Sequence, residues 1–436
     1  MEMAIQRILT SAAILVWLLC GSASAQQPVP LPRQPIGGGL AQHGVTPGVA
    51  PAVPFQAGGQ TQLATAQSND QEDEAPELSS VGRCCAVCGG GSCCPPDWYV
   101  NEGVSVFHHS RPSSRRVSWY GPPDFGGVEA TGTRGLSFDI AAGYTITVGR
   151  NLGRDTDNRD QFVEFCWDGM HTWKSTKTIH SSRADWIGLG LLSGNLYSGY
   201  PFDVGGFNRA EMHYFAYRSR LDSYELNAWI RPRGRSDRLV LHPNGRWRRE
   251  CQPGWYNSYM FGMRVFCLQE DFTFLASGRI TELDPRKDTV RVEGSHVTRT
   301  DNDMLGFQFG GDIIFRRCLW SWGFRYRIGP LLNFADMKTV ATTTGAADGD
   351  PYVAEDLDLY RFAKNTDLAA FADIGVVGSY KIRPNVIVHV SWDWMWMIGL
   401  ALAPENLEFD ITKPAEVNDD GDLFFQGLTA SLEWTW

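Results

Sequence analysis

The C-terminal segment, residues 427–436, alternates without error between apolar side chains and polar or small ones. One face of an extended chain would carry Leu428, Ala430, Leu432, Trp434 and Trp436. A period of two indicates a β-strand with one apolar face. The length matches the roughly nine to eleven residues of a transmembrane strand and exceeds the usual strand of about five or six. We therefore predict a membrane-spanning strand that ends in an aromatic girdle.

The same one-sided alternation recurs in four earlier segments, 136–149, 303–315, 320–333 and 386–398. A buried parallel sheet would be apolar on both faces, so these segments predict a sheet with one face toward lipid and the other toward a polar interior. The first segment places Leu136, Phe138 and Ile140 on its apolar face. The tryptophans predicted to face lipid are Trp320, Trp322, Trp392, Trp394, Trp396, Trp434 and Trp436.

The spacing of the predicted strands favours a closed barrel over an open sheet. We place strands at 98–107, 136–149, 160–168, 208–218, 222–232, 256–267, 272–280, 303–315, 320–333, 366–380, 386–398 and 423–436. Short connections at 150–159, 219–221, 268–271, 316–319 and 381–385 then alternate with long ones, one of them at 233–255. An even strand number with short turns on one side is typical of outer-membrane barrels. The predicted fold class is all-β: a closed antiparallel transmembrane β-barrel of about 12 strands (about 10–14) over residues 98–436.

Two segments precede this barrel. Residues 1–25 have an arginine, an apolar stretch and a small-residue site at Ala23–Ala25, which predicts a cleaved signal peptide. Residues 26–97 are rich in Pro, Gln and Gly, become acidic and end in a cysteine-rich cluster. They contain too little apolar surface to fold alone, so we expect a flexible, disordered spacer located in the periplasm. No apolar run reaches the length of a transmembrane helix.

The cysteine-rich cluster consists of Cys84, Cys85, Cys88, Cys93 and Cys94. In an exported protein, disulfides or cross-links between chains are favoured, and zinc binding through the CxxC spacing is the alternative. Because the number is odd, at least one sulfur needs a partner outside the cluster. The predicted topology places Cys267 and Cys318 near the periplasmic turns, and Cys166 and Cys251 toward the outer loops.

Charge and composition limit the partners. The formal net charge is −10, which argues against nucleic acid because phosphate binding requires basic patches. The expected partners are outer-membrane lipid and the barrel-assembly machinery, with self-association or disulfide cross-linking through the cysteine cluster. We expect localisation in the cell outer membrane.

The polar faces of the strands supply candidate residues for the barrel lumen: Gln308, Asp312, Arg325, Arg327, His389 and Asp393. Charged residues inside a barrel set ion selectivity or form ion pairs that fill it, and both interpretations stay open. His389 with Ser391 has the residue types of a base and a nucleophile, but lumen lining is favoured over catalysis. The sequence predicts no enzymatic activity, no cofactor and no metal.

Several stretches resemble, in the same order, the β-barrel porin family of planctomycete outer envelopes. They are "SYELNAWIRP", "MFGMRVFCLQEDFTF", "TDNDMLGFQFGGDIIF" and "AFADIGVVGSYKIRPNVIVHVSWDWMW", and the matching residues are Glu225, Asn227, Gly262, Arg264, Glu270, Asn302, Gly306, Gln308 and the turn 383–385. The ending, with Thr429, Ser431, Trp434 and Trp436, is similar to the assembly signal of bacterial outer-membrane barrels. The resemblance implies an outer-membrane barrel. We predict either a porin-like passive channel for small polar solutes or a structural envelope component. The alternative is a secreted β-sandwich adhesin.

Overall fold

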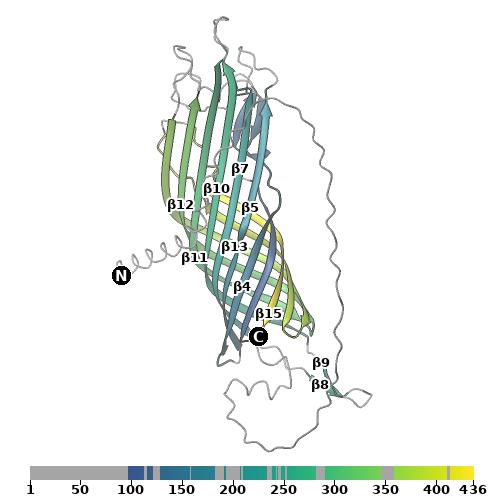
Figure 1. Cartoon of the computed structure of the whole chain (residues 1–436). Helices are drawn as coiled ribbons and strands as arrows, with labels where there is room; N and C mark the ends of the chain where they lie inside the picture. The colour runs from purple at the N-terminus through teal and green to yellow at the C-terminus, as the bar shows by residue number, and fades with distance from the viewer. Residues whose placement is uncertain are drawn as a thin grey trace, which may run out of the picture.

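The first and last strands of the chain pair with each other and close a ten-stranded antiparallel ring (Figure 1). This is a computed structural model, and it describes residues 97–436 except 112–114, 121–127, 158, 182–190, 193–206, 208–209, 233–237, 242, 244–246, 251–252, 281–289, 345–357 and 410–412. The signal peptide, the spacer and the cysteine-rich cluster predicted before the barrel lie outside the described residues.

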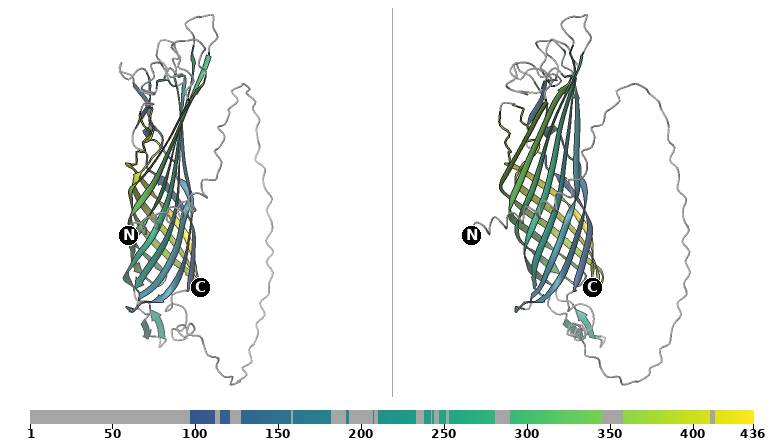
Figure 2. Two further views of the ribbon diagram at one scale, coloured as in Figure 1. Left: turned by 90° about the vertical axis from the view of Figure 1, so that its left-hand side faces the viewer. Right: turned by 60° about the vertical axis from the view of Figure 1, so that its left-hand side comes forward.

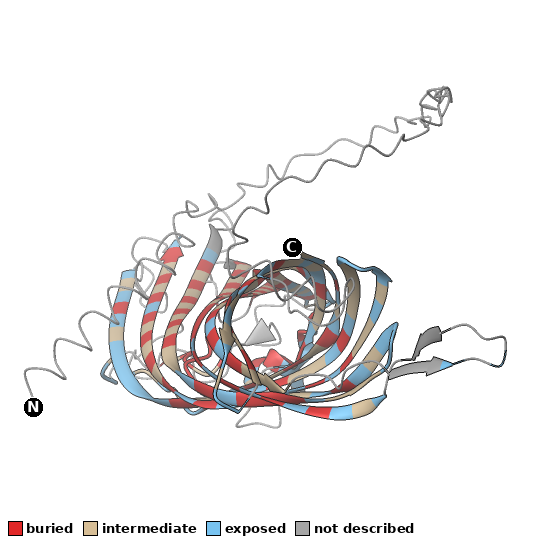
Figure 3. Ribbon diagram, turned by 90° about the horizontal axis from the view of Figure 1, so that it is seen from below, coloured by how far each residue is buried: buried red, intermediate tan, exposed pale blue. Residues whose placement is uncertain are grey.

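The strands form a ring when the molecule is viewed end-on (Figure 3). Their order is β1, β15, β14, β13, β12, β11, β10, β7, β5, β4, and β4 pairs again with β1. The ring strands are β1 (Trp98–His109), β4 (Ala141–Arg154), β5 (Arg159–His180), β7 (Met212–Pro232), β10 (Gly254–Ile280), β11 (Val290–Arg316), β12 (Trp320–Thr344), β13 (Asp358–Arg383), β14 (Val386–Leu400) and β15 (Gly421–Thr435). Outside the ring lie β2 (Arg116–Tyr120), β3 (Val128–Gly132), β6 (Leu191–Leu192), β8 (Arg238–Leu241), β9 (Trp247–Glu250) and a short 3-10 helix (Thr133–Gly135).

The prediction of an all-β closed antiparallel barrel is confirmed, and the β-sandwich alternative is wrong because one sheet closes on itself. The ring has ten strands instead of twelve. The predicted strands 208–218 and 222–232 are one strand, β7, and 256–267 and 272–280 are one strand, β10. The alternation continues through both predicted turns, because Ser219 and Glu270 are buried polar residues on the inner face.

β1 begins and β15 ends at the same end of the ring, which we call the terminal end; the opposite end is the loop end. The turns at 155–158, 317–319 and 384–385 lie at the terminal end. The β8–β9 hairpin, which lies between β7 and β10 in the chain, is also at this end (Figure 1). This connection was predicted as an outer loop, because the false turn within β7 reversed the assigned direction of the chain.

The turn between β4 and β5 shows how these connections are fixed. Asp155 Oδ1 accepts hydrogen bonds from the amides of Arg159 at 2.8 Å and Asp157 at 3.0 Å. The amide of Arg159 is the largest cause that lowers the pKa of Asp155, and the Arg159 guanidinium, 2.7 Å from Oδ2, acts in the same direction.

Six strands, β5, β7 and β10–β13, are 21 to 27 residues long and continue beyond the closed ring as a curved wall (Figure 2). Near the terminal end their outer face is apolar, with Phe261, Phe307 and Ile328 about half exposed. Farther along the outer face carries ion pairs such as Lys364 with Asp336, at 2.6 Å. This change from apolar to charged residues marks one edge of the band that a membrane would cover.

A hydrophobic core fills the barrel near the loop end. Each ring strand contributes an inward side chain: Phe107, Ala141, Trp173, Leu221, Phe266, Met304, Leu331, Phe371, Met397 and Phe425. The cap segment, residues 399–409, folds onto these side chains, and its Ala401, Leu402, Ala403 and Leu407 are fully buried. The core separates the loop end from the rest of the lumen.

Leu136 and Phe138 also belong to this core, with exposed fractions of 2% and 4%. They were predicted on a lipid-facing strand, but they lie before β4, in the segment that follows the short 3-10 helix. Ile140 is 67% exposed. Within the described residues, no helix has the length and apolar character needed to span a membrane.

Candidate functional site

A cavity of about 600 Å³ occupies the lumen on the terminal side of the core. Its lining includes the turn residues Arg317, Cys318 and Leu319, so the cavity reaches the terminal end of the ring. At its other end the lining includes Phe266 and Phe425, which belong to the core. The cavity is therefore a polar chamber with an apolar floor.

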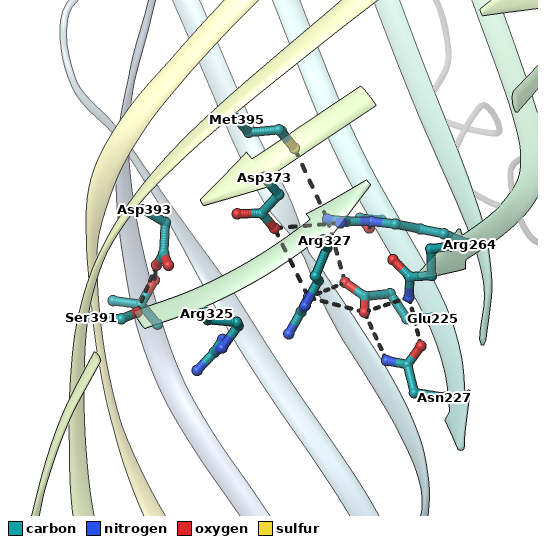
Figure 4. Close-up of polar contacts among 12 residues, drawn as sticks. Glu225, Asn227, Arg264, Arg325, Arg327, Asp373, Ser391, Asp393 and Met395 are labelled. Carbon is teal, nitrogen blue, oxygen red and sulfur yellow. Dashed lines mark hydrogen bonds and ion pairs between the residues drawn. The ribbon is translucent and has the colours of Figure 1, made fainter. Parts of the chain in front are cut away.

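A buried ion-pair network, the charge cluster, lies just beside that floor (Figure 4). Glu225 on β7 accepts from Arg327 Nη1 at 2.8 Å and lies 3.3 Å from Arg264 Nη2. Asn227 and Gln308 also donate to Glu225, at 2.9 and 3.0 Å. The alternation of β7, β10, β11 and β12 brings these side chains to the inner face, where they neutralise and hydrogen-bond one another.

Arg264 joins the charge cluster to the hydrophobic core. Its guanidinium lies 4.2 Å from the ring centroid of Phe266 and 4.9 Å from that of Phe371. Asp373 completes the charge cluster, 3.5 Å from Arg264 Nη1. A buried charge that loses its partner costs about 3–5 kcal/mol, so these residues act as one unit.

The wall formed by β1, β4 and β5 holds two further polar groups. Glu164 accepts from the hydroxyl of Tyr99 and from Arg231 Nη2, the latter at 2.5 Å. Ser105 donates to Asp168 Oδ1 at 2.8 Å, and its oxygen lies 2.9 Å from His171 Nε2. The acids of this wall are therefore occupied by partners within the protein.

The structure places all six predicted lumen residues on the inner face. Gln308 and Arg327 belong to the charge cluster, and Arg325 lies 3.6 Å from Asp312 Oδ1. His389 pairs with Glu433 at 3.0 Å instead of activating Ser391, which donates to Asp393 Oδ2 at 2.6 Å. Each of these two side chains is therefore hydrogen-bonded to a carboxylate and not to the other.

The predicted lipid-facing tryptophans lie on the outer face. Exposed fractions are 45% for Trp392, 52% for Trp396 and 64% for Trp436, with Trp394 half-buried. Trp320, Trp322 and Trp434 are exposed as well. Their contact with lipid stays a prediction.

Six of the residues that were noted for the family resemblance lie in two groups on the inner face. Glu225, Asn227, Arg264 and Gln308 belong to the charge cluster. Gly262 lies against it: a Cβ there would be 2.1 Å from Asn227 Oδ1. Gln308 was predicted to line the lumen, whereas Glu225, Asn227 and Arg264 were given no role, although the same alternation places them inside.

The second group holds the cap segment in place. Asn302 donates to the carbonyl of Ala401 at 2.8 Å and accepts from its amide at 2.7 Å. Glu270 accepts from the amide of Ala403 at 3.0 Å and from the hydroxyl of Tyr217 at 2.6 Å. Asn333 donates to the carbonyl of Gly399 at 2.9 Å. Polar side chains of the barrel wall therefore replace the strand pairing that these backbone groups lack.

The described cysteines lie differently from the predicted pattern. Cys166 is a free thiol that lines the cavity on β5, not a residue of the outer loops. Cys267 lies within β10, where it pairs with Asp222 and Asp303, and not at a turn. Cys318 lies in the terminal-end turn between β11 and β12, as predicted. Cys251 falls outside the described residues. Among those residues, no group of three or more His, Cys, Asp or Glu could hold a metal ion.

Comparison with solved structures finds outer-membrane β-barrels. The outer membrane protease OmpT of Escherichia coli matches over 78% of this chain and 97% of its own, with 13% identity and a TM-score of 0.33. A monoaromatic hydrocarbon channel, a TodX deletion mutant, matches over 79% and 91%, with 8% identity and a TM-score of 0.25. OprB of Pseudomonas putida matches over 78% and 94%, with 6% identity and a TM-score of 0.14.

No protein-family model and no curated protein sequence match the chain. The prediction that the chain is not an enzyme is contradicted by the match to a protease, and we withdraw that exclusion. At 13% identity and a TM-score of 0.33, the likeness assigns no activity to this chain.

Proposed function

We propose that the chain is a structural component of the outer membrane that anchors its N-terminal segment to the cell envelope, with a lumen closed to solutes. The observation that carries this proposal is the hydrophobic core, to which all ten ring strands contribute. A packed apolar layer across the lumen leaves no aqueous path between the two ends.

The outer face supports a place in the membrane. Exposed apolar residues continue around the ring, for example Val104 on β1, Ile374 on β13 and Leu428 on β15. Such a band on the outside of a closed sheet is typical of transmembrane barrels. β1 begins at the terminal end, so the chain that precedes Trp98 joins the barrel at that end. We propose that the cysteine-rich cluster of this preceding segment cross-links neighbouring chains in the periplasm.

A porin-like passive channel for small polar solutes is the second candidate. The polar cavity favours it, since its lining contains carboxylates, guanidinium groups and hydroxyls. Conduction would require the core to open. The hydrogen bonds that hold the cap segment to Asn302 and Glu270 would then have to break.

Swelling of proteoliposomes distinguishes the two candidates. The wild-type chain is expected to give no swelling in a small sugar such as arabinose, while remaining in the membrane after a carbonate wash. Asn302→Leu removes both hydrogen bonds to Ala401 and is expected to raise the swelling rate if the cap segment blocks the path. Rapid swelling of the wild type would support the channel, and release by carbonate would contradict the membrane anchor.

A further inference from the structure

The cavity has one wall whose positive charge is not neutralised. This cationic wall consists of Arg316 on β11, Arg325 on β12 and Lys381 on β13, all lining the cavity. Within the described parts of the chain, no carboxylate oxygen lies within ion-pair distance of Arg316 or Lys381, whereas Arg325 has a single contact of 3.6 Å to Asp312. The side chain of Arg325 is 32% exposed.

The acids elsewhere in the cavity are engaged with other partners. Glu164 pairs with Arg231, and Glu433 pairs with His389. Glu225 is shared by two arginines of the charge cluster. Asp393 accepts from two hydroxyls, of Ser391 at 2.6 Å and Thr429 at 3.4 Å. At the cationic wall itself, three cationic side chains face a single carboxylate of the described residues within ion-pair distance, that of Asp312.

The register of the strands brings the cationic wall together. Arg316 pairs with Ser321 on β12, and Ser321 pairs with Ser379 on β13, two residues from Lys381. Neighbouring strands are about 4.8 Å apart and two residues along a strand span about 6.8 Å, so the main chains of Arg316 and Lys381 lie about 12 Å apart. The hydroxyls of Ser321 and Ser379, 2.6 Å apart, lie between them and add donors. Arg325 projects from the same face, four residues farther along β12.

We propose that the cationic wall binds a small anion that carries a phosphate or carboxylate group and enters from the terminal end. Guanidinium groups match both anions in geometry, and an ammonium adds a point charge. The cavity volume is in the range of small-molecule sites. The site goes beyond the proposed anchoring role, and it does not depend on whether the lumen conducts, because it lies on the open side of the core.

Calorimetric titration of the full-length barrel in detergent at low ionic strength tests the site, with inorganic phosphate and succinate as separate probes. We expect saturable binding of at least one probe and none of ethanolammonium, a cation of similar size. The double variant R316Q/K381Q should weaken binding by about tenfold or more, because it removes two charged donors. R150Q is the matched control: Arg150 is exposed at the same end but lies on the outer face over Trp98.

A second variant, which is expected to bind the anion more tightly, controls for misfolding of the double variant. D312N removes the carboxylate beside Arg325, so it should tighten anion binding while leaving the cavity in place. Binding of phosphate alone would assign a phosphate-bearing ligand, and binding of both probes a general anion site. Absence of saturable wild-type binding to either anion would overturn the proposal. So would equal affinities in the wild type, R316Q/K381Q and D312N.

Discussion

Two adjacent residues of β14 test the assignment of the barrel faces. Val390 is 44% exposed on the outer face, and His389 faces the lumen, where it pairs with Glu433. We compare Val390→Arg with His389→Arg, so that the same side chain is introduced one residue apart. An arginine at His389 can keep the ion pair with Glu433, whereas one at Val390 enters the apolar band.

The expected magnitude follows from the depth of Val390. Along β14, Val386 is the outer-face residue closest to the terminal end, and Val390 lies two outward positions farther on. Two steps of about 6.8 Å along a strand tilted by about 35–45° correspond to a depth of about 10–11 Å. The apolar band of such barrels is about 25 Å tall, so Val390 lies close to its middle. A mid-depth arginine costs about 2–4 kcal/mol of folding free energy.

Urea titration of the barrel folded into lipid vesicles measures both variants. Val390→Arg should lower the free energy of unfolding by about 2–4 kcal/mol, and His389→Arg by less than about 1 kcal/mol. Equal losses in the two variants, or a larger loss at His389, would show that the inner and outer faces are assigned wrongly.

Three further changes test other parts of the structure. Glu225→Ala leaves two buried arginines short of a partner and should cost about 3–5 kcal/mol in the urea titration, whereas Asp336→Ala, at an exposed ion pair, should cost about 0–1 kcal/mol. Phe425→Ala opens the core and should cost about 3–5 kcal/mol; an unchanged midpoint would mean that the core is not packed as described. Deleting Trp436 removes its two main-chain hydrogen bonds to Trp98, at 3.0 and 3.1 Å. The deletion should reduce the amount of folded barrel, measured as the faster-migrating band on gel electrophoresis of unheated samples, more than Thr435→Ala does.

The alternation of side chains was sufficient to predict the barrel and the inner and outer faces of most strands. It failed where a polar residue faces a filled lumen. Ser219 and Glu270 were interpreted as turn residues, but each is buried on the inner face of a continuous strand. A strand that encloses an ion-pair network has polar residues on its inner face, so polarity alone does not mark its end.

Strand length was underestimated for a related reason. Residues 290–302 and 334–344 continue β11 and β12 beyond the apolar band, where the outer face carries Arg299, Asp301 and Asp336. Their alternation is weak because neither face is strongly apolar there, so they were predicted as loops. Pairing with neighbouring strands maintains them instead.

The sequence predicted which individual residues face the lumen, but not which of them contact one another. The inward position of Arg327 followed from its place in the strand. Its partner Glu225 is 102 residues away, and only the register of the closed ring brings the two together. The cap segment was not predicted from the sequence, because its main chain is held by side chains far away in the sequence: Asn302 donates to the carbonyl of Ala401, and Glu270 accepts from the amide of Ala403.

We propose that the membrane-spanning barrel has a lumen closed by a core to which every ring strand contributes. Single-channel recording of the purified full-length chain in a planar lipid bilayer measures this closure. We expect that insertion of the wild-type chain produces no stable conductance steps, and that steps appear when Asn302→Leu releases the cap segment. Uniform ohmic steps from the wild-type chain would contradict it.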